Sequence, residues 1–464
     1  MAVDRKKLRA LIQYHIFEKE AFSQHAAGPD YDFFVSSAIP LFGGTLGGMR
    51  YNTGGELFPN NGVFARAADA GNVATLLQRG MTRKYTGDLI PRTHLQEKRL
   101  ISQDESWLAD FLGAKMVVRD KNPTRAQKVL ARADHYDEEV QALFERAGSF
   151  VQGLNIPDAT CLDAPNISGF YNTAPDSNTG EVKMTYVRRR TEHVHCLPEN
   201  APYFGSGNPS VVTATGVVGA IKALRERRFA EEDIINIGIR GGAGSVGAYI
   251  IQFLREYEAS GYLGFKVNIK ASDIERNRSE LEKVAGKYDA IIVDDQEFRN
   301  VHMWVPSAFI GSVTPDVVDL LDNYTVIVGP ENEQLPENPL NPHDPAIEKA
   351  VSAIYARLKE IEGYYSPDFV NNNGGIHDVN CRVMFGKEGY SKERAIQTML
   401  EAGQAYVGAV HDRTMQEQRA RSSELIQSHR IAEEMALDAL VDRIIERRGD
   451  VLKGPFAAYF AAAL

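Results

Sequence analysis

The sequence lacks an excess of positive charge and any long apolar run. Its 52 lysines and arginines are outnumbered by 62 acidic residues, for a net charge of -10. No positive surplus is therefore available to neutralise phosphates, which argues against a nucleic-acid or anionic-membrane partner. No stretch approaches the roughly 20 apolar residues of a membrane span. The first twenty residues are charged throughout and lack the apolar core of a signal peptide.

Cysteine is also scarce, with only three residues: Cys161, Cys196 and Cys381. Their wide spacing and odd number fit a reducing compartment, so we expect a cytoplasmic protein. The string "EHVHC" places His193 and His195 beside Cys196. Nothing else nearby has the spacing of metal ligands, and we predict no metal site.

What the sequence does contain is an ordinary soluble composition over 464 residues, long enough for two domains. From Ile234 onwards, short β-branched runs alternate with helix-forming segments: "IINIGIR", "KVNIKAS", "DAIIVDD", "HMWVPSA" and "YTVIVGP". Such runs are typical of a parallel sheet covered on both faces. We predict an α/β fold with a Rossmann-like, doubly wound nucleotide domain at 206–374. An α+β domain would occupy 1–205, and the helices of 375–464 would return to it.

The segment "IINIGIRGGAGSVGAYIIQFL" indicates a strand, a glycine turn and a helix. Its G-x-G-x-x-G pattern is formed by Gly242, Gly244 and Gly247, with Ser245 and Val246 between the last two. The first glycine would make the tight turn, the second would admit a pyrophosphate, and the third would allow close helix–strand packing. The helix N-terminus would then face the phosphates. This context predicts a dinucleotide site.

A carboxylate after the next strand bears on which dinucleotide is bound. Asp273 lies 26 residues past Gly247, and a carboxylate there accepts hydrogen bonds from both ribose hydroxyls and repels a 2′-phosphate. This favours NAD. Arg276 and Arg278 follow closely and could hold that phosphate instead, which leaves NADP open.

Six segments in order resemble the glutamate/leucine/phenylalanine/valine dehydrogenase family, most closely its leucine dehydrogenase branch. They are "LFGGTLGGMRY", "RGMTRK", "FVQGLNIPDATCLD", "FGSGNPSVVTATGVVGAIKAL", "VIVGPENEQL" and "SPDFVNNNGGIHDV". The resemblance implies an NAD(P)-dependent oxidoreductase that acts on the CH–NH2 group of amino acids. It also implies a homo-oligomer.

The resemblance assigns roles to individual residues. Lys84 would bind the substrate α-carboxylate, Lys115 would be the catalytic lysine, and Asp163 would shuttle a proton to and from the amine. Lys115 falls where the family has a glycine turn followed by a strand. Cofactor contacts would come from Thr213, Ser307, Ala308, Asn332 and Asn372, in addition to the glycine turn and Asp273.

The chemistry of deamination supports these assignments separately. Loss of hydride from an α-amine gives an imine, and hydrolysis of that imine needs a base for water and a proton relay to nitrogen. A lysine acts as a base only when burial or a second cation lowers its pKa. Lys84 would be that second cation. The rival interpretation of Lys115 is an ordinary solvated lysine at the start of a strand.

The substrate side-chain pocket is expected to be apolar. Relatives that bind a dicarboxylate carry a lysine and a hydroxyl residue at positions that read Leu46 and Val379 here. The remaining expected substrate contacts are Gly47, Gly48, Met81, Cys161 and Ile376. A charged side chain would lack a partner in such a pocket, at a cost of several kcal/mol. A neutral aliphatic or aromatic amino acid is therefore favoured over glutamate.

The chain departs most from the family between Lys84 and Lys115. The 31-residue step is far longer than the resemblance implies and indicates an insertion at about 85–111, beside the substrate cleft. Lys98 is a competing candidate for the base, but its neighbours are charged and no glycine turn precedes it. The alternatives to a neutral amino acid dehydrogenase are a biosynthetic relative that reduces an imine or oxidises a bulky amino acid, and a non-catalytic dinucleotide-binding regulator.

Overall fold

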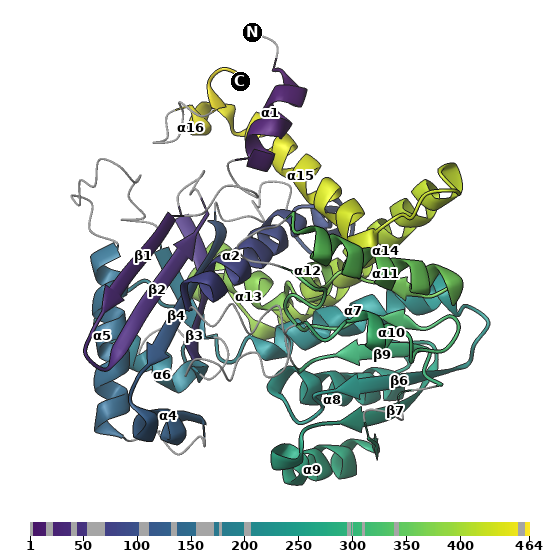
Figure 1. The fold of residues 1–464 in the computed structure, drawn as a ribbon, viewed down its shortest axis with the longest axis horizontal. Coiled ribbons are helices and arrows are strands. Elements are labelled where there is room, and N and C mark those ends of the chain that lie inside the picture. The colour runs from purple at the N-terminus through teal and green to yellow at the C-terminus, as the bar shows by residue number, and fades with distance from the viewer. Residues whose placement is uncertain are drawn as a thin grey trace.

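The structure is a computed structural model. It describes residues 3–14, 22–38, 44–52, 70–101, 111–130, 137–154, 171–175, 179–198, 206–294, 298, 300–308, 311–337, 343–452 and 460–464. Two sheets lie side by side, with helices between them and around them (Figure 1). Among the described residues, no helix combines the length and the apolar character that a membrane span would require.

The first sheet has five strands in the order β1-β2-β4-β3-β5. These strands are β1 (Phe22–Ala27), β2 (Tyr31–Ser37), β3 (Gly44–Asn52), β4 (Phe111–Asp120) and β5 (Tyr171–Pro175). Strand β4 pairs antiparallel with β2 and parallel with β3, so it is central. Its helices are α2 (Ala70–Gly87), α3 (Arg92–Glu97), α4 (Pro123–Leu130), α5 (Glu138–Leu154) and α6 (Gly180–Arg188). Helix α5 contributes Val140, Phe144, Ala147 and Val151 to the core, at the spacing of one helix face.

The second sheet is wholly parallel, in the order β11-β10-β9-β6-β7-β8. Its strands are β6 (Ile234–Arg240), β7 (Lys266–Ser272), β8 (Ile291–Ile292), β9 (Met303–Pro306), β10 (Val326–Ile327) and β11 (Tyr364–Tyr365). Its helices include α7 (Ser210–Arg228), α8 (Ser245–Ala259), η4 (Glu275–Asn277), α9 (Arg278–Tyr288), α10 (Pro315–Val318) and α11 (Pro345–Glu360). This arrangement confirms the predicted Rossmann-like α/β fold.

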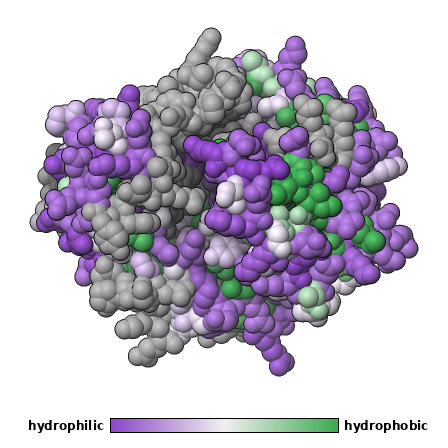
Figure 2. All heavy atoms as spheres, turned by 90° about the horizontal axis from the view of Figure 1, so that it is seen from below, coloured by the Kyte–Doolittle hydropathy of each residue, from purple (hydrophilic) through white to green (hydrophobic). Residues whose placement is uncertain are grey.

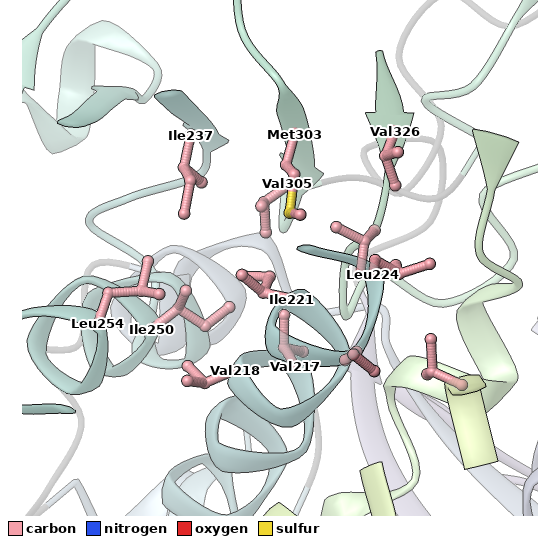
Figure 3. Packing of buried hydrophobic residues seen from close by; sticks show 14 of the residues in the cluster. Val217, Val218, Ile221, Leu224, Ile237, Ile250, Leu254, Met303, Val305 and Val326 are labelled. Carbon is pink, nitrogen blue, oxygen red and sulfur yellow. The ribbon is translucent and has the colours of Figure 1, made fainter. Parts of the chain in front are cut away.

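Strands β9 and β10, in the middle of the parallel sheet, are buried on both faces and lack a polar face, whereas β7 exposes Lys266 and Asn268. Met303 and Val305 of β9 pack with α7 and α8, as Figure 3 shows, through contacts that include Ile221 and Ile250. Trp304, the residue between them, points to the other face and joins the cluster of α11. The alternation follows from the two-residue period of a strand, and it explains why the sequence reads as near-continuous apolar runs.

The chain after the nucleotide region forms α12 (Asp368–Asn371), α13 (Gly374–Gly389), α14 (Lys392–Ala420), α15 (Ser428–Glu446) and α16 (Arg448–Val451). Helix α14 packs along α7, while α15 contacts α2. The N-terminal helix α1 (Arg5–Ile12) buries Leu8 and Ile12 against Leu440 and Ile444 of α15, so the two ends of the chain lie together (Figure 1). Helices from the C-terminal segment therefore contact both halves. The predicted domain boundaries at 205 and 374 stay predictions.

Candidate active site

The glycine turn lies between β6 and α8, at the carboxyl end of the parallel strands. Gly244 caps α8 with extended backbone and no side-chain cap, which leaves the first N–H groups of the helix unused by any capping side chain. A side chain at Gly247 would collide with the carbonyl of Gly241. The turn is therefore shaped to bring backbone close to a phosphate group, and it fits a dinucleotide.

The tight turn itself is made one residue earlier than the spacing predicted. Gly241, not Gly242, adopts the left-handed backbone, with φ of 87°. A Cβ on Gly241 would also lie 2.7 Å from the carbonyl oxygen of Ser307. The extra glycine before G-x-G-x-x-G thus performs the turn expected of Gly242, because the strand end must pass close to β9.

Asp273 directly follows β7 and faces this turn. Its carboxylate accepts hydrogen bonds from the backbone N–H of Ala243 at 2.9 Å and from the side chain of Asn277 at 2.8 Å. Arg276 and Arg278 are exposed. The carboxylate is thus held at the edge of the glycine turn, which is where a ribose would lie.

The other predicted cofactor contacts come from three separate segments. Ser307 and Ala308 follow β9 beside Gly241. Thr213 lies on α7, where a side chain on Gly374 would collide with its backbone, so α13 begins close against α7. The structure therefore places Ser307 at the glycine turn, and it places Thr213 beside the segment that carries Asn372.

Three predicted residues meet between the two sheets. Lys84 lies in the last turn of α2, and its Nζ donates a hydrogen bond to the amide oxygen of Asn332. Asn372 donates to the same oxygen at 2.9 Å. The residue expected to hold substrate carboxylate is therefore in contact with the loops expected to hold the cofactor.

Lys115 is buried in β4, with 2% of its surface exposed. Burial, then the charges of Arg50 and Lys84, hold the pKa of its amine well below the ordinary value. Burial also lowers the pKa of Lys84, to about 8, against the opposing charges of Asp368 and Glu333. The solvated alternative for Lys115 is wrong, because the amine is enclosed and faces other cations.

Gly113, two residues before Lys115, does not form the turn that the family resemblance implied. Gly113 is part of strand β4, not of a turn. A side chain there would collide with the backbone of Met81 and Thr82 on α2. On the other side of the strand pair, a side chain on Gly47 would collide with the carbonyl of Ala114. These glycines let α2, β3 and β4 approach closely, which brings Lys84 and Lys115 together.

The predicted apolar pocket residues form one cluster. Ile376 and Val379, on α13, are buried together with Tyr85, Ala174 and Cys196, and Met81 packs against them. The sequence did not indicate Tyr85, Ala174 or Cys196 as members. Strand β3 contains Leu46, Gly47 and Gly48, with Leu46 paired to Gly113 through the backbone. Asp163 and Cys161 lie outside the described residues.

Charged residues near the amines were also missed. Arg50 ends the "GGMR" string with 3% exposure, and burial lowers the pKa of its guanidinium to about 10. Glu333 and Asp368 follow the cofactor-side strands and are buried as well. Of these three charged residues, only Arg50 could have been noticed in the sequence, because it lies between the glycine pairs at 47–48 and 54–55.

The described residues contain no group of three or more histidine, cysteine or acidic side chains that could hold a metal ion. His195 is half-buried, and desolvation lowers its pKa to about 3. Cys196 and Cys381 are both buried free thiols.

Figure 2 shows a predominantly hydrophilic face, hollowed near the middle of the view. Lys84, Lys115 and the apolar cluster, by contrast, lie in the interior between the two sheets. The arrangement can therefore accept an anionic group at two amines while an uncharged side chain is buried nearby.

Comparison with known proteins gives relatives of one kind. The leucine dehydrogenase of Bacillus subtilis is 27% identical over 326 residues, which cover 66% of this chain and 77% of the relative. The phenylalanine dehydrogenase of Lysinibacillus sphaericus is 25% identical over 275 residues, 58% of this chain and 61% of its own length. The crystal structure of L-tryptophan dehydrogenase from Nostoc punctiforme superposes with a TM-score of 0.56 at 20% identity, over 94% of this chain and 98% of that one. No family model matches the chain.

Proposed function

Starting from its place among the NAD(P)-dependent amino acid dehydrogenases of the glutamate/leucine/phenylalanine/valine family, we propose that this chain reversibly deaminates a neutral L-amino acid to the 2-oxo acid and ammonia. The observation that carries the proposal is the enclosed pair of lysines. Two amines in one buried site, one with its pKa held well below normal, suit a base that works beside a carboxylate-binding cation.

In this proposal, Lys84 binds the α-carboxylate and gives up its hydrogen bond with Asn332 when the substrate arrives. The free amine of Lys115 accepts a proton from the water that attacks the imine carbon. Asp163 would exchange a proton with the substrate nitrogen, a role that stays a prediction. When bound, the nicotinamide accepts the hydride. Burial of the lysines excludes bulk water, which strengthens these charge interactions.

A neutral substrate side chain is supported by the cluster of Met81, Ile376 and Val379. Asp88, a carboxylate whose charge acts on Tyr85 of this cluster, is itself paired with His377. The cluster offers apolar contact, and a second substrate carboxylate would be buried against it at a cost of several kcal/mol. We expect aliphatic or aromatic amino acids to turn over and glutamate to be a poor substrate.

A spectrophotometric panel tests this proposal. NADH absorbance would be followed with neutral, acidic and basic L-amino acids and, in reverse, with 2-oxo acids and ammonia. We expect turnover with at least one neutral amino acid and at least 100-fold lower kcat/KM for glutamate, from one unpaired buried charge. Tight NADH binding without turnover on any substrate would instead identify a non-catalytic regulator. Turnover restricted to aromatic substrates would favour the bulky-amino-acid relative.

NAD is the proposed cofactor, on the support of Asp273 at the glycine turn. Replacing Asp273 by serine should raise the KM for NAD about tenfold and improve the use of NADP, because the repulsion of a 2′-phosphate is lost while Arg276 and Arg278 remain. Steady-state kinetics with both cofactors measure this. A variant with an unchanged NAD/NADP ratio would show that another group selects the cofactor.

The assembly and location of the protein are part of the same proposal. A homo-oligomer is supported by the family resemblance, and a reducing cytoplasm by the buried free thiols of Cys196 and Cys381. Size-exclusion chromatography with light scattering would give the oligomeric state directly.

A further inference from the structure

Arg83, the neighbour of Lys84 on α2, is surrounded by three carboxylates from two distant parts of the chain. Its guanidinium lies 2.9 Å from Glu433 of α15, 3.3 Å from Glu337 and 3.6 Å from Glu333. Of the three acids, Glu333 is the most enclosed, with 5% of its side chain exposed against 16% for Glu337 and 35% for Glu433. One cation is thus shared among three anions.

The distribution of charge argues against full ionisation of this cluster, which we define as Arg83, Glu333, Glu337 and Glu433. All three carboxylates share Arg83, while Arg79 acts in addition on Glu337 and Arg430 on Glu433, so the enclosed Glu333 is the least compensated of the three. Close carboxylates in such a site share a proton, and the most enclosed one keeps it. Burial, followed by the charges of Glu337 and Asp368, accordingly raises the pKa of Glu333 well above its ordinary value. Burial would also raise the pKa of Glu337, yet Arg83 and a hydrogen bond with Glu333 bring it below normal.

Glu333 is held in place by an unfavourable backbone. Its φ of 50° is left-handed, a conformation that is unfavourable for a non-glycine residue. Its N–H donates to Asp368 at 2.7 Å. Its carboxyl group lies against α2 where only Gly80 leaves room, since a Cβ there would collide with Oε1. The surrounding structure therefore fixes this carboxyl beside Arg83, where its charge acts on both site lysines.

The charge state of Glu333 matters to both amines. A negative Glu333 raises the pKa of Lys115 and also that of Lys84. Lys115 must lose its proton to act as a base, so an ionised Glu333 would oppose its function. A protonated Glu333 occupies the same space without that effect.

We propose that Glu333 is a positioning residue that holds a proton shared with Glu337 and thereby leaves Lys115 as a free amine. The proposal rests on the role given to Lys115 under the proposed function. The charged and titratable groups that act on Glu333 or its partners come from every element packed around them. They are, on α2, Arg83, Lys84 and Arg79; on β3 and β4, Arg50 and Lys115; on α15, Glu433, Arg430 and His429; on α11 and α14, Tyr355 and Tyr406; and, from its own side, Glu337, Asp368 and Tyr365.

The sign of the effect can be tested with two substitutions. In Glu337→Gln, the proton-sharing partner is lost and Arg83 turns to Glu333, which ionises and raises the pKa of Lys115. The pH at which kcat/KM reaches half its plateau should move upward by about one unit, which is a tenfold loss below that pH. In the double variant Glu333→Gln/Glu337→Gln, the midpoint should return towards the wild-type value. A double variant that keeps the full shift would overturn the proposal.

A matched control is the cross-helix pair of Arg227 and Asp412, 2.9 Å apart and away from the site. Asp412→Asn removes an ion pair between α7 and α14, and its pH midpoint should match that of the wild type. A similar shift in this control would show that any loosening of helix packing moves the profile, which also overturns the proposal.

A second readout does not need turnover. Cyanate reacts with free amines and not with ammonium groups, so carbamoylation of Lys115, located by peptide mass mapping across pH, reports its protonation directly. Glu333→Gln is the uncharged isostere, and it should leave this midpoint unmoved if Glu333 already carries a proton. An ionised Glu333 predicts instead a midpoint about one unit lower in the variant. If the labelling behaves as expected but no amino acid turns over, the proposed function fails while the proton assignment stands.

Discussion

Replacing Lys115 by methionine is expected to lower kcat for amino acid oxidation by about 10²- to 10⁴-fold, the range that a positioned general base contributes. Methionine preserves an apolar stem in the buried strand, so the fold should survive. Because Lys115 lies in β4 and the glycine turn lies between β6 and α8, NADH binding should remain close to that of the wild type. Stopped-flow absorbance and NADH fluorescence titration measure the two effects separately.

The matched control is Lys98→Met, at the competing lysine of the insertion. Lys98 is 55% exposed and its nearest acidic partner is Glu401 at 3.9 Å, so its loss should change kcat less than twofold. If Lys115→Met kept full activity and Lys98→Met lost it, Lys98 would be the base, and the mechanism proposed above would be wrong.

The pH profile of the wild type should follow the lowered pKa of the Lys115 amine. A lysine amine with a lowered pKa is protonated only at lower pH, so activity should rise as the pH passes upward through that pKa and should then hold, until another group titrates. An ordinary lysine would give this rise only near its usual value of about 10.4.

The parallel sheet could be predicted because its strands are short β-branched runs separated by helix-forming segments. "IINIGIR" and "KVNIKAS" are strands β6 and β7 at the bounds that these strings suggest. "YTVIVGP" shows the limit of that signal, since only Val326 and Ile327 within it form a strand. Apolar runs identify a buried strand, but hydrogen bonding to neighbours decides how many residues join it.

The site could be predicted where a residue is itself part of a local pattern. The lysines, the glycine turn and the asparagines fall in short strings with recognisable spacing, and Lys84, Asn332 and Asn372 do meet. The cluster around Arg83 could not be found this way. Its members are brought together from α2, the loop after β10 and α15, and each string alone reads as an ordinary charged surface.

Two glycines, Gly113 and Gly241, show the same limit of prediction from local strings. In the sequence, Gly113 lies where the family has a glycine turn before the lysine, and Gly241 directly precedes the G-x-G-x-x-G pattern. In the fold, the first admits α2 against β4 and the second takes the left-handed turn. Which glycine must lack a side chain depends on the segment opposite it, and that segment is distant in sequence.

Lys84→Met should produce the second large effect, through two consequences of one lost charge. A substrate carboxylate would lose its buried partner, which costs about 2–5 kcal/mol and lowers kcat/KM by roughly 30- to 4,000-fold, mostly through a higher KM. The charge of Lys84 also lowers the pKa of Lys115, so its removal should move the acid limb of the pH profile upward. Substrate titrations at several pH values measure both changes.

Lys84→Arg separates the two consequences, because it keeps the charge but changes the shape of the donor. The acid limb should return to its wild-type position, since the cation near Lys115 is restored. The KM should stay raised, because a planar guanidinium cannot take the place of an Nζ that fits between α2 and Asn332. If Lys84→Arg recovered the KM without restoring the pH profile, the lowered pKa of Lys115 would have to come from burial and Arg50 alone, and Lys84 would only hold the substrate.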